Sequence, residues 1–168
     1  SQVCCMYSMK QGQLLLGALP MADVTIYYIN IRAFGKGFEE FYEGTKGMGV
    51  EFVKGKVGKI EEKENGDLVV RYEDMQKGSV REAEHDMVVL SVGMLSNPEA
   101  GKLFKGGALE LDEFGYVRQV DMLGNPAATS IEGVFVAGTA SGPMDIPDSI
   151  ASAGAASAEA LSYIQRNS

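Results

Sequence analysis

Apolar and polar positions in the first part of the chain follow helical and extended spacing in turn. Residues 1–19 have the length of a helix and stop at a proline. Residues 23–31 are rich in β-branched and aromatic side chains, which is typical of a strand. Aromatic residues then recur on one helix face over residues 38–49, which end in glycine-containing sequence. The pattern predicts helix, strand, helix.

A three-stranded antiparallel meander is predicted next. Residues 50–63 read as extended, and the Asn65-Gly66 pair that follows is a strong hairpin signal. The chain returns over residues 68–73, turns again, and forms a third strand at residues 80–84. This arrangement needs only short connections between neighbouring strands.

Two continuous apolar runs, Met87–Val92 and Gly133–Ala137, read as strands buried on both faces of a parallel sheet. A glycine ends each run. Between them we expect a connection over residues 97–112, with a short helix or turn near Leu103, and a small strand pair that brackets Gly115.

The sequence after Gly138 is the stretch whose pattern implies chemistry. Its next nine residues contain one glycine and two prolines and so form a loop, after which Asp148 or Ser149 is expected to supply a helix N-cap. From Ile150 the helix consists almost entirely of Ala, Ser and Gly, so a flat ligand can approach it closely. Such a strand, loop and helix present N–H groups and a positive dipole end to an electron-rich ligand.

Composition narrows the class of protein. The 168 residues are 45 % hydrophobic, and no run approaches the roughly 20 apolar residues that cross a bilayer. A net charge of −8 argues against nucleic acid. The adjacent Cys4 and Cys5 are expected to be reduced or metal-bound, in a protein of the cytoplasm. His85 is the only histidine and lies in an acidic stretch, so a catalytic triad based on histidine is set aside. Because Ser1 is no start methionine, the chain is expected to be a piece of a longer protein.

The segment G-V-F-V-A-G-T at 133–139 resembles the second flavin-contacting segment of thioredoxin reductase-like flavoproteins. That resemblance implies FAD, with a glycine approaching the ribityl chain and the helix N-terminus aimed at the isoalloxazine edge that gains negative charge on reduction. Thr139 departs from the pattern, which usually has aspartate there. The cofactor-binding residues so implied are Gly138, Thr139, Ala140, Pro147, Asp148, Ser149 and Ile150.

Four separated stretches give a more specific resemblance, to the A subunit of the heterodisulfide reductases. They are V-C-C-M-Y-S-M-K at 3–10, N-I-R-A-F-G-K-G at 30–37, V-V-L-S-V-G at 88–93 and V-F-V-A-G-T-A-S-G-P-M-D-I-P-D-S at 134–149. The resemblance covers nearly the whole chain and includes Thr139. It implies an oxidoreductase in which FAD and [4Fe-4S] clusters exchange electrons, supporting flavin-based electron bifurcation and reduction of the CoM-S-S-CoB heterodisulfide.

The same resemblance implies roles near the N-terminus. Residues 1–5 match the end of a C-S-x-V-C-C pattern, so Cys4 and Cys5 would be cluster ligands, although clusters commonly need four thiolates and the chain has two cysteines. Buried thiols that pack as small hydrophobes are the alternative. Lys10 would lie near flavin N5 and stabilise the anionic reduced form, whereas a solvated surface lysine is the alternative. Asp148 would cap the helix or handle protons.

The expected fold is α/β, with partial Rossmann-like lobes of the two-dinucleotide-binding type. Residues 1–95 would form a partial pyridine-nucleotide-type lobe with the β-meander, lacking its first strand and G-x-G-x-x-G loop, and residues 96–168 the C-terminal part of an FAD-binding lobe. Gly35-Lys36-Gly37 is too short for that fingerprint and reads as a turn.

The expected partners are other heterodisulfide reductase subunits, an electron-donating hydrogenase or dehydrogenase, and a second copy in a homodimer. The isolated chain is expected to be poorly active. Two alternatives stay open: a non-catalytic α/β domain that binds a partner or nucleotide, and a fragment of a general FAD/NAD(P)-dependent oxidoreductase. The latter usually carries a C-x-x-C pair, which Cys4-Cys5 cannot provide.

Overall fold

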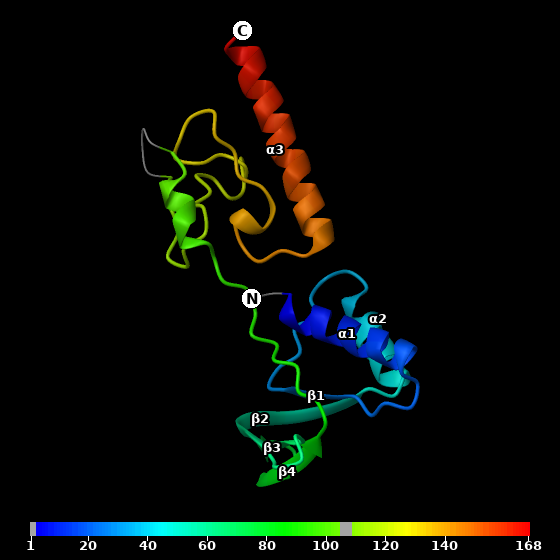
Figure 1. Cartoon of the computed structure of the whole chain (residues 1–168). Helices are drawn as coiled ribbons and strands as arrows, with labels where there is room; N and C mark the ends of the chain where they lie inside the picture. Colours follow the sequence, from blue (N-terminus) through cyan, green and yellow to red (C-terminus); the bar gives the residue numbers. More distant parts are fainter. Residues whose placement is uncertain (1–2, 105–108) are drawn as a thin grey trace. The chain divides into compact units, whose positions relative to one another are not determined.

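The chain divides into two units in a computed structural model that describes residues 3–104 and 109–168. One unit spans Cys4–Val92, and Gly93–Ser168 belongs to the other (Figure 1). Ser1 and Gln2, which open the predicted cysteine pattern, lie outside the described residues, as does part of the predicted 97–112 connection.

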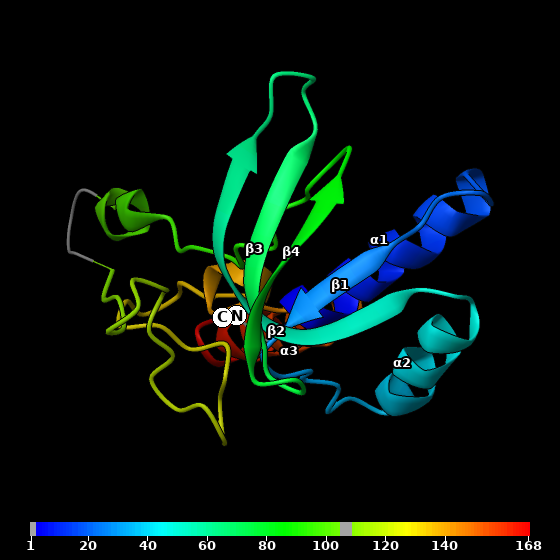
Figure 2. The same cartoon turned by 90° about the horizontal axis from the view of Figure 1, so that it is seen from below.

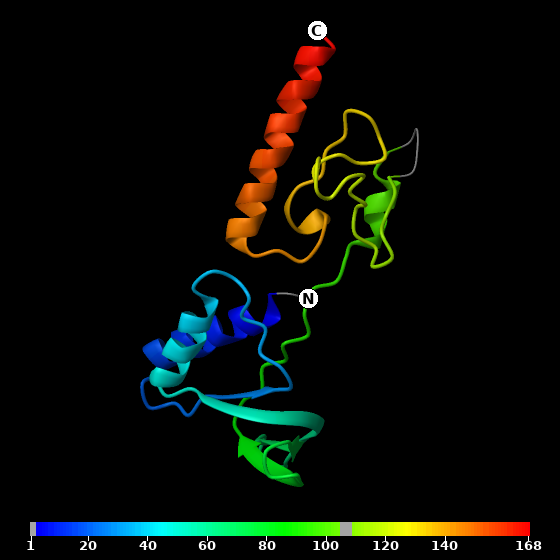
Figure 3. The same ribbon diagram turned by 180° about the vertical axis from the view of Figure 1, so that it is seen from behind.

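The unit Cys4–Val92 begins with the predicted helix, strand, helix order. Helices α1 (Cys4–Ala18) and α2 (Phe38–Gly47) pack against each other on one side of β1 (Thr25–Tyr28), as Figures 1 and 3 show. The strand β1 is shorter than predicted and pairs in parallel with β2 (Glu51–Glu62). Parallel pairing requires a crossover, and α2 supplies it.

The meander is confirmed. Strands β3 (Leu68–Asp74) and β4 (Ser79–His85) extend the sheet in the order β1-β2-β3-β4, with both added pairings antiparallel (Figure 2). A β-bulge interrupts the pairing of β2 with β3 between Val57 and Lys59.

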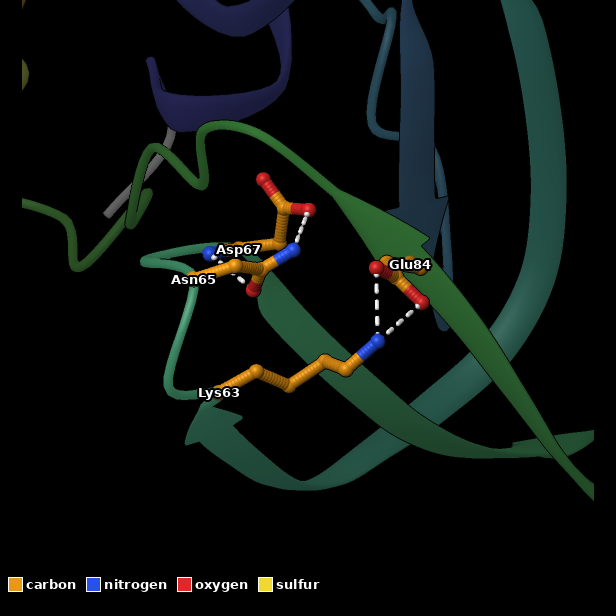
Figure 4. A network of polar contacts seen from close by, with 4 residues as sticks. All are labelled: Lys63, Asn65, Asp67 and Glu84. Atoms are coloured by element: carbon orange, nitrogen blue, oxygen red, sulfur yellow. Dashed lines mark hydrogen bonds and ion pairs between the residues drawn. The ribbon is translucent and has the colours of Figure 1, made fainter.

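The β2–β3 hairpin turns at the predicted Asn65-Gly66 pair. Gly66 has φ +89°, a left-handed value that favours glycine, and the N–H of Asp67 donates to Asn65 Oδ1 over 3.1 Å. Across the strands, Lys63 Nζ donates to both carboxylate oxygens of Glu84 at 2.8 Å (Figure 4). This hydrogen bond holds the pKa of Glu84 below its ordinary value.

The core of this unit joins α1 to the sheet. Met9 is completely buried, and Val50, Val70 and Tyr72 are at most 7 % exposed. The buried hydroxyl of Thr45 accepts a hydrogen bond from Gln13 Nε2 at 2.8 Å and donates one to a carbonyl of its own helix, so this buried polar group is satisfied.

The predicted buried strand Met87–Val92 is wrong. This segment has no strand structure, and Met87 and Val92 are 71 % and 83 % exposed. Ser91 Oγ lies 2.8 Å from Ser8 Oγ and donates to Tyr7 Oη at 3.1 Å, so the segment is attached to α1. A parallel strand needs a neighbour, and among the described residues β1 pairs with β2 alone.

The unit containing Gly93–Ser168 has one long helix, α3 (Ile146–Arg166), and the short 3-10 helices η1 (Pro98–Lys102) and η2 (Gly138–Ala140). Its small core consists of Leu109, Val117 and Val136. The predicted strand pair around Gly115 is reduced to one antiparallel bridge, Leu111 to Val117.

The second predicted parallel strand, Gly133–Ala137, is also wrong. Phe135 makes a single antiparallel bridge with Ala128, and the N–H of Val136 donates to the Ala127 carbonyl at 2.9 Å. The run is apolar enough for a buried strand, but no parallel neighbour exists among the described residues. Across those same residues, no helix has the length and hydropathy to cross a membrane.

Candidate functional site

Helix α3 starts four residues earlier than predicted. Its N-cap is Asp145, whose carboxylate accepts from the N–H of Asp148 at 2.8 Å. Pro147 occupies the first turn, where the missing N–H of a proline costs nothing. The predicted caps, Asp148 and Ser149, are therefore wrong, and the sequence D-I-P contained the signal that identifies the true start.

The earlier start changes which amides a ligand could reach. The N–H of Ser149 donates to the Asp145 carbonyl at 2.9 Å and is part of the helix. Two carboxylates, those of Asp145 and Asp148, also lie at the positive end of the helix dipole. The apolar side chains of this segment nevertheless face outward, because Ile146 and Ile150 are 77 % and 68 % exposed. The first turns of α3 are thus open to a ligand, but the two carboxylates already neutralise part of the positive charge at this end of the helix dipole.

The loop after Gly138 lies against these first turns. Gly138 has φ +61°, and its N–H donates to Ser152 Oγ at 3.0 Å. A Cβ on Gly138 would lie 3.8 Å from Ser149, which is ordinary contact, so the left-handed backbone rather than crowding favours glycine. The Ala140 carbonyl accepts from the N–H of Val117 at 2.9 Å. Gly138–Ala140 and the start of α3 therefore form one surface.

Thr139 places an uncharged polar side chain on this surface. The residue is exposed, as is Ala140, and the structure gives its hydroxyl no hydrogen-bond partner among the described residues. On the adjoining helix α3, Pro147 and Asp148 are exposed, whereas Ser149 is half-buried. The predicted cofactor-binding residues of this unit are thus gathered on two adjoining elements, η2 and α3.

The predicted metal and flavin residues of the other unit lie on α1. Cys4 and Cys5 stand in its first turn with unpaired, half-buried thiols, and Cys5 Sγ lies 3.7 Å from the Asn30 carbonyl. Lys10 is exposed on the same helix. Across residues 3–104 and 109–168, no group of three His, Cys, Asp or Glu side chains could hold a metal. Two thiolates do not fit a [4Fe-4S] cluster without ligands from elsewhere.

Sequence patterns did not reveal a polar contact at the sheet of this unit. Tyr27 Oη lies 2.9 Å from His85 Nε2, and its ring centroid is 4.8 Å from that of Tyr72. Burial, followed by the influence of Tyr72 and Glu51, raises the pKa of Tyr27 to about 12. The contact joins residues 58 positions apart, a separation at which local spacing carries no signal.

Comparison with known proteins shows the family to which the chain belongs. Residues 11–160 match the pyridine nucleotide-disulphide oxidoreductase family. The chain belongs to this family. Its fold is that of thioredoxin reductases: the enzyme from Lactococcus lactis aligns with 86 % of the chain at a TM-score of 0.61 and 20 % identity, over 46 % of its own length. This confirms the predicted α/β, Rossmann-like class.

Two relatives also confirm the more specific resemblance. One is the A subunit of the H2:CoB-CoM heterodisulfide,ferredoxin reductase of Methanothermobacter thermautotrophicus, 43 % identical over 95 % of the chain. The other is the iron-sulfur A subunit 2 of the CoB-CoM heterodisulfide reductase of Methanopyrus kandleri, 42 % identical over 98 %. The chain spans about a quarter of either relative, 24 % and 25 % of their lengths.

Proposed function

We propose that this chain is part of a flavoprotein like the A subunit of the heterodisulfide reductases, in which FAD exchanges electrons with iron-sulfur clusters. The observation that supports this most is the open surface formed by Gly138–Ala140 and the first turns of α3. In this proposal residues 1–95 belong to the nucleotide-type lobe and residues 96–168 to the FAD lobe.

The chain's residues would hold FAD by shape and hydrogen bonding more than by helix charge. Thr139 offers an exposed hydroxyl to a ribityl or phosphate oxygen, and left-handed Gly138 keeps the adjoining backbone free of a side chain. Ile150 and Pro147 give an apolar surface for a flat ring, with Ser149 beside them. FAD would supply hydride and single-electron chemistry, which protein side chains lack. Asp145, and not Asp148, keeps the helix capped.

Lys10 and the cysteine pair complete the proposal. Lys10 is exposed, so its ammonium can approach a reduced flavin and stabilise its negative charge. Cys4 and Cys5 would supply two thiolates of a [4Fe-4S] cluster, with the remaining ligands coming from polypeptide outside this chain. The same proposal includes electron bifurcation, with a hydrogenase or dehydrogenase as electron donor and CoM-S-S-CoB as final acceptor. It also includes a homodimer and a cytoplasmic location.

Measurements of FAD binding test the proposed function. A polypeptide extended to the length of the relatives should bind FAD stoichiometrically in absorbance titrations, whereas the 168-residue chain should bind weakly. Thr139→Val should lower FAD affinity about threefold to tenfold, because one neutral hydrogen bond is lost at nearly constant shape. Lys10→Met should leave the stoichiometry unchanged and lower the flavin midpoint potential, since the reduced anion loses a nearby cation.

Ser162→Ala is the matched control, because it removes an exposed hydroxyl far along the same helix. It should leave FAD affinity unchanged. An extended polypeptide that stays colourless with FAD rules out the flavoprotein assignment. Equal affinities for the Thr139 and Ser162 variants would remove Thr139 from the site while leaving the assignment standing.

A further inference from the structure

The turn between β2 and β3 contains the one asparagine of the chain that a glycine follows. Of the five asparagines in the sequence, Asn65 precedes Gly66, two precede proline, and the other two precede isoleucine and serine. In spontaneous deamidation, the backbone nitrogen of the next residue attacks the side-chain carbonyl carbon of the asparagine. Proline has no N–H to lose, and any side chain on the next residue hinders the approach, whereas glycine presents neither obstacle. Asn65 is therefore the asparagine whose sequence neighbour favours this reaction most.

The closed turn holds both reacting groups in other interactions. The N–H of Gly66, whose nitrogen would attack, donates to the Lys63 carbonyl at 2.9 Å. Asn65 Oδ1 accepts from the N–H of Asp67 at 3.1 Å, and Asn65 Nδ2 donates to Asp67 Oδ2 (Figure 4). The side-chain amide is thus fixed on Asp67, while the nitrogen that would attack it is bound to Lys63.

The charges around the turn act in the same direction. The attack requires the Gly66 amide to lose its proton, so negative charge develops on its nitrogen, and the nearby carboxylate of Asp67 opposes that charge. The ammonium of Lys63 could offset it, but this group donates to both carboxylate oxygens of Glu84 at 2.8 Å (Figure 4). Asn65 and Gly66 are exposed, so water has access to both residues. The hydrogen bonds and charges of the turn, rather than burial, therefore slow the reaction.

We propose that Asn65 is a site of spontaneous deamidation and that opening of the hairpin turn controls the rate of this modification. When the turn opens, the Gly66 nitrogen forms a bond to Asn65 Cγ, ammonia leaves, and a succinimide ring closes. Water then adds to either ring carbonyl and opens the ring, which gives aspartate or isoaspartate at position 65. The net reaction consumes one water and releases one ammonia, with no oxidant or reductant. The inference does not depend on flavin binding.

Either product weakens the turn that delayed its formation. Aspartate at position 65 lacks the Nδ2 donor and places a second carboxylate beside that of Asp67. Isoaspartate also adds a methylene to the backbone of a loop that the N–H of Lys63 closes by donating to the Asp67 carbonyl at 2.8 Å. Because loop length fixes the register of a hairpin, isoaspartate would disturb the pairing of β2 with β3. The modification therefore leaves a permanent mark on chains whose hairpin has opened.

Mass spectrometry of the folded 168-residue chain, incubated at mildly alkaline pH and then digested, tests the proposal. The reference is a synthetic peptide of residues 60–70, which is too short to hold a hairpin alone. Asn65 should deamidate about tenfold or more slowly in the folded chain than in the peptide, because local opening must precede the attack. Asp67→Ala, made in both chain and peptide, should raise the ratio of folded rate to peptide rate about threefold to tenfold, since Asn65 Nδ2 loses its acceptor.

Glu82→Ala is the matched control, because it removes an exposed carboxylate from the same sheet, opposite Arg71 and away from the turn. It should leave the ratio of folded rate to peptide rate unchanged. Asp67→Asn keeps an acceptor but not the charge and should raise the ratio about twofold, so it serves if Asp67→Ala fails to fold by circular dichroism. Equal rates in the folded chain and the peptide, faster deamidation at another asparagine, or equal ratios for the Asp67 and Glu82 variants would overturn the proposal.

Discussion

The two units of this chain differ in how far each completes its own hydrogen bonding. The unit Cys4–Val92 builds a four-stranded sheet, and three of its strands are joined by short local turns. In the described part of Gly93–Ser168 the extended residues meet only in isolated bridges beside α3. The meander forms because each strand meets its neighbour within a few residues, while a parallel strand depends on a partner distant in sequence.

Exposed apolar side chains lie where such partners are lacking. In the first unit they include Met87, Val89, Leu90 and Val92, all at least 67 % exposed, in the run that was predicted to be a buried strand. In the second unit Ile146, Ile150, Leu161 and Ile164 are 56 % to 77 % exposed along α3. Both units thus expose apolar surface, but only the first has a continuous hydrogen-bonded sheet, so the first unit is expected to be the more stable of the two.

Matched core truncations measure that difference. Val70 is 2 % exposed in the first unit and Val136 is 5 % exposed in the second. Val70→Ala should cost about 2 kcal/mol of unfolding free energy, because two buried methyl groups are lost and the surrounding sheet is rigid. Val136→Ala should cost about 1 kcal/mol, because half-buried neighbours such as Val134 can close the space.

Hydrogen exchange read by mass spectrometry localises each effect. Val70→Ala should accelerate exchange in β2, β3 and β4 only, and Val136→Ala only in the second unit. Equal costs, or acceleration that spreads over the whole chain in both variants, would show that the units unfold together and that the difference between them is not energetic.

Sequence reasoning succeeded where the signal was local. Asn65-Gly66 specified a hairpin, and aromatic spacing located α2, because a left-handed turn and an amphipathic face are properties of adjacent residues. It failed for Met87–Val92 and Gly133–Ala137, since an apolar run becomes a buried strand only beside another strand.

Sequence reasoning predicted the order of loop and helix after Gly138 but not their bounds. The helix starts at Ile146 instead of Ile150 and is capped by Asp145 rather than Asp148, so the Ser149 amide is bonded inside the helix instead of being free for the expected contact. The direction in which Lys59 points could not be predicted, because the β-bulge between Val57 and Lys59 decides it.

A substitution at Gly66 tests whether the local hairpin turn contributes to the stability of the first unit. Gly66→Ala places a Cβ in a left-handed turn and should cost about 1 to 2 kcal/mol, although the surrounding space is open. Gly47→Ala is the control: it lies at the end of α2, also in open space and without positive φ, and should stabilise the unit by about 0.4 to 1 kcal/mol. Urea unfolding followed by circular dichroism compares the two. A neutral Gly66→Ala would mean that the hairpin turn does not limit stability.

The smallest expected effect concerns the contact that links β1 to β4. Because the folded state raises the Tyr27 pKa from 10.0 to about 12, the unfolded phenol ionises first. The stabilisation is therefore fully present below about pH 10 and is lost as the pH rises to about 12. Tyr27→Phe should remove this alkaline decline and, near neutral pH, cost about 1 kcal/mol through the lost hydrogen bond to His85.

Urea unfolding at a series of alkaline pH values measures this decline. Tyr163→Phe, which removes one phenol from the second unit, should decline as the unmodified chain does. Parallel declines in Tyr27→Phe and the unmodified chain would assign the alkaline loss to other groups. The junction between the parallel and antiparallel parts of the sheet would then be maintained by the tilted ring contact between Tyr27 and Tyr72 rather than by the tyrosine–histidine hydrogen bond.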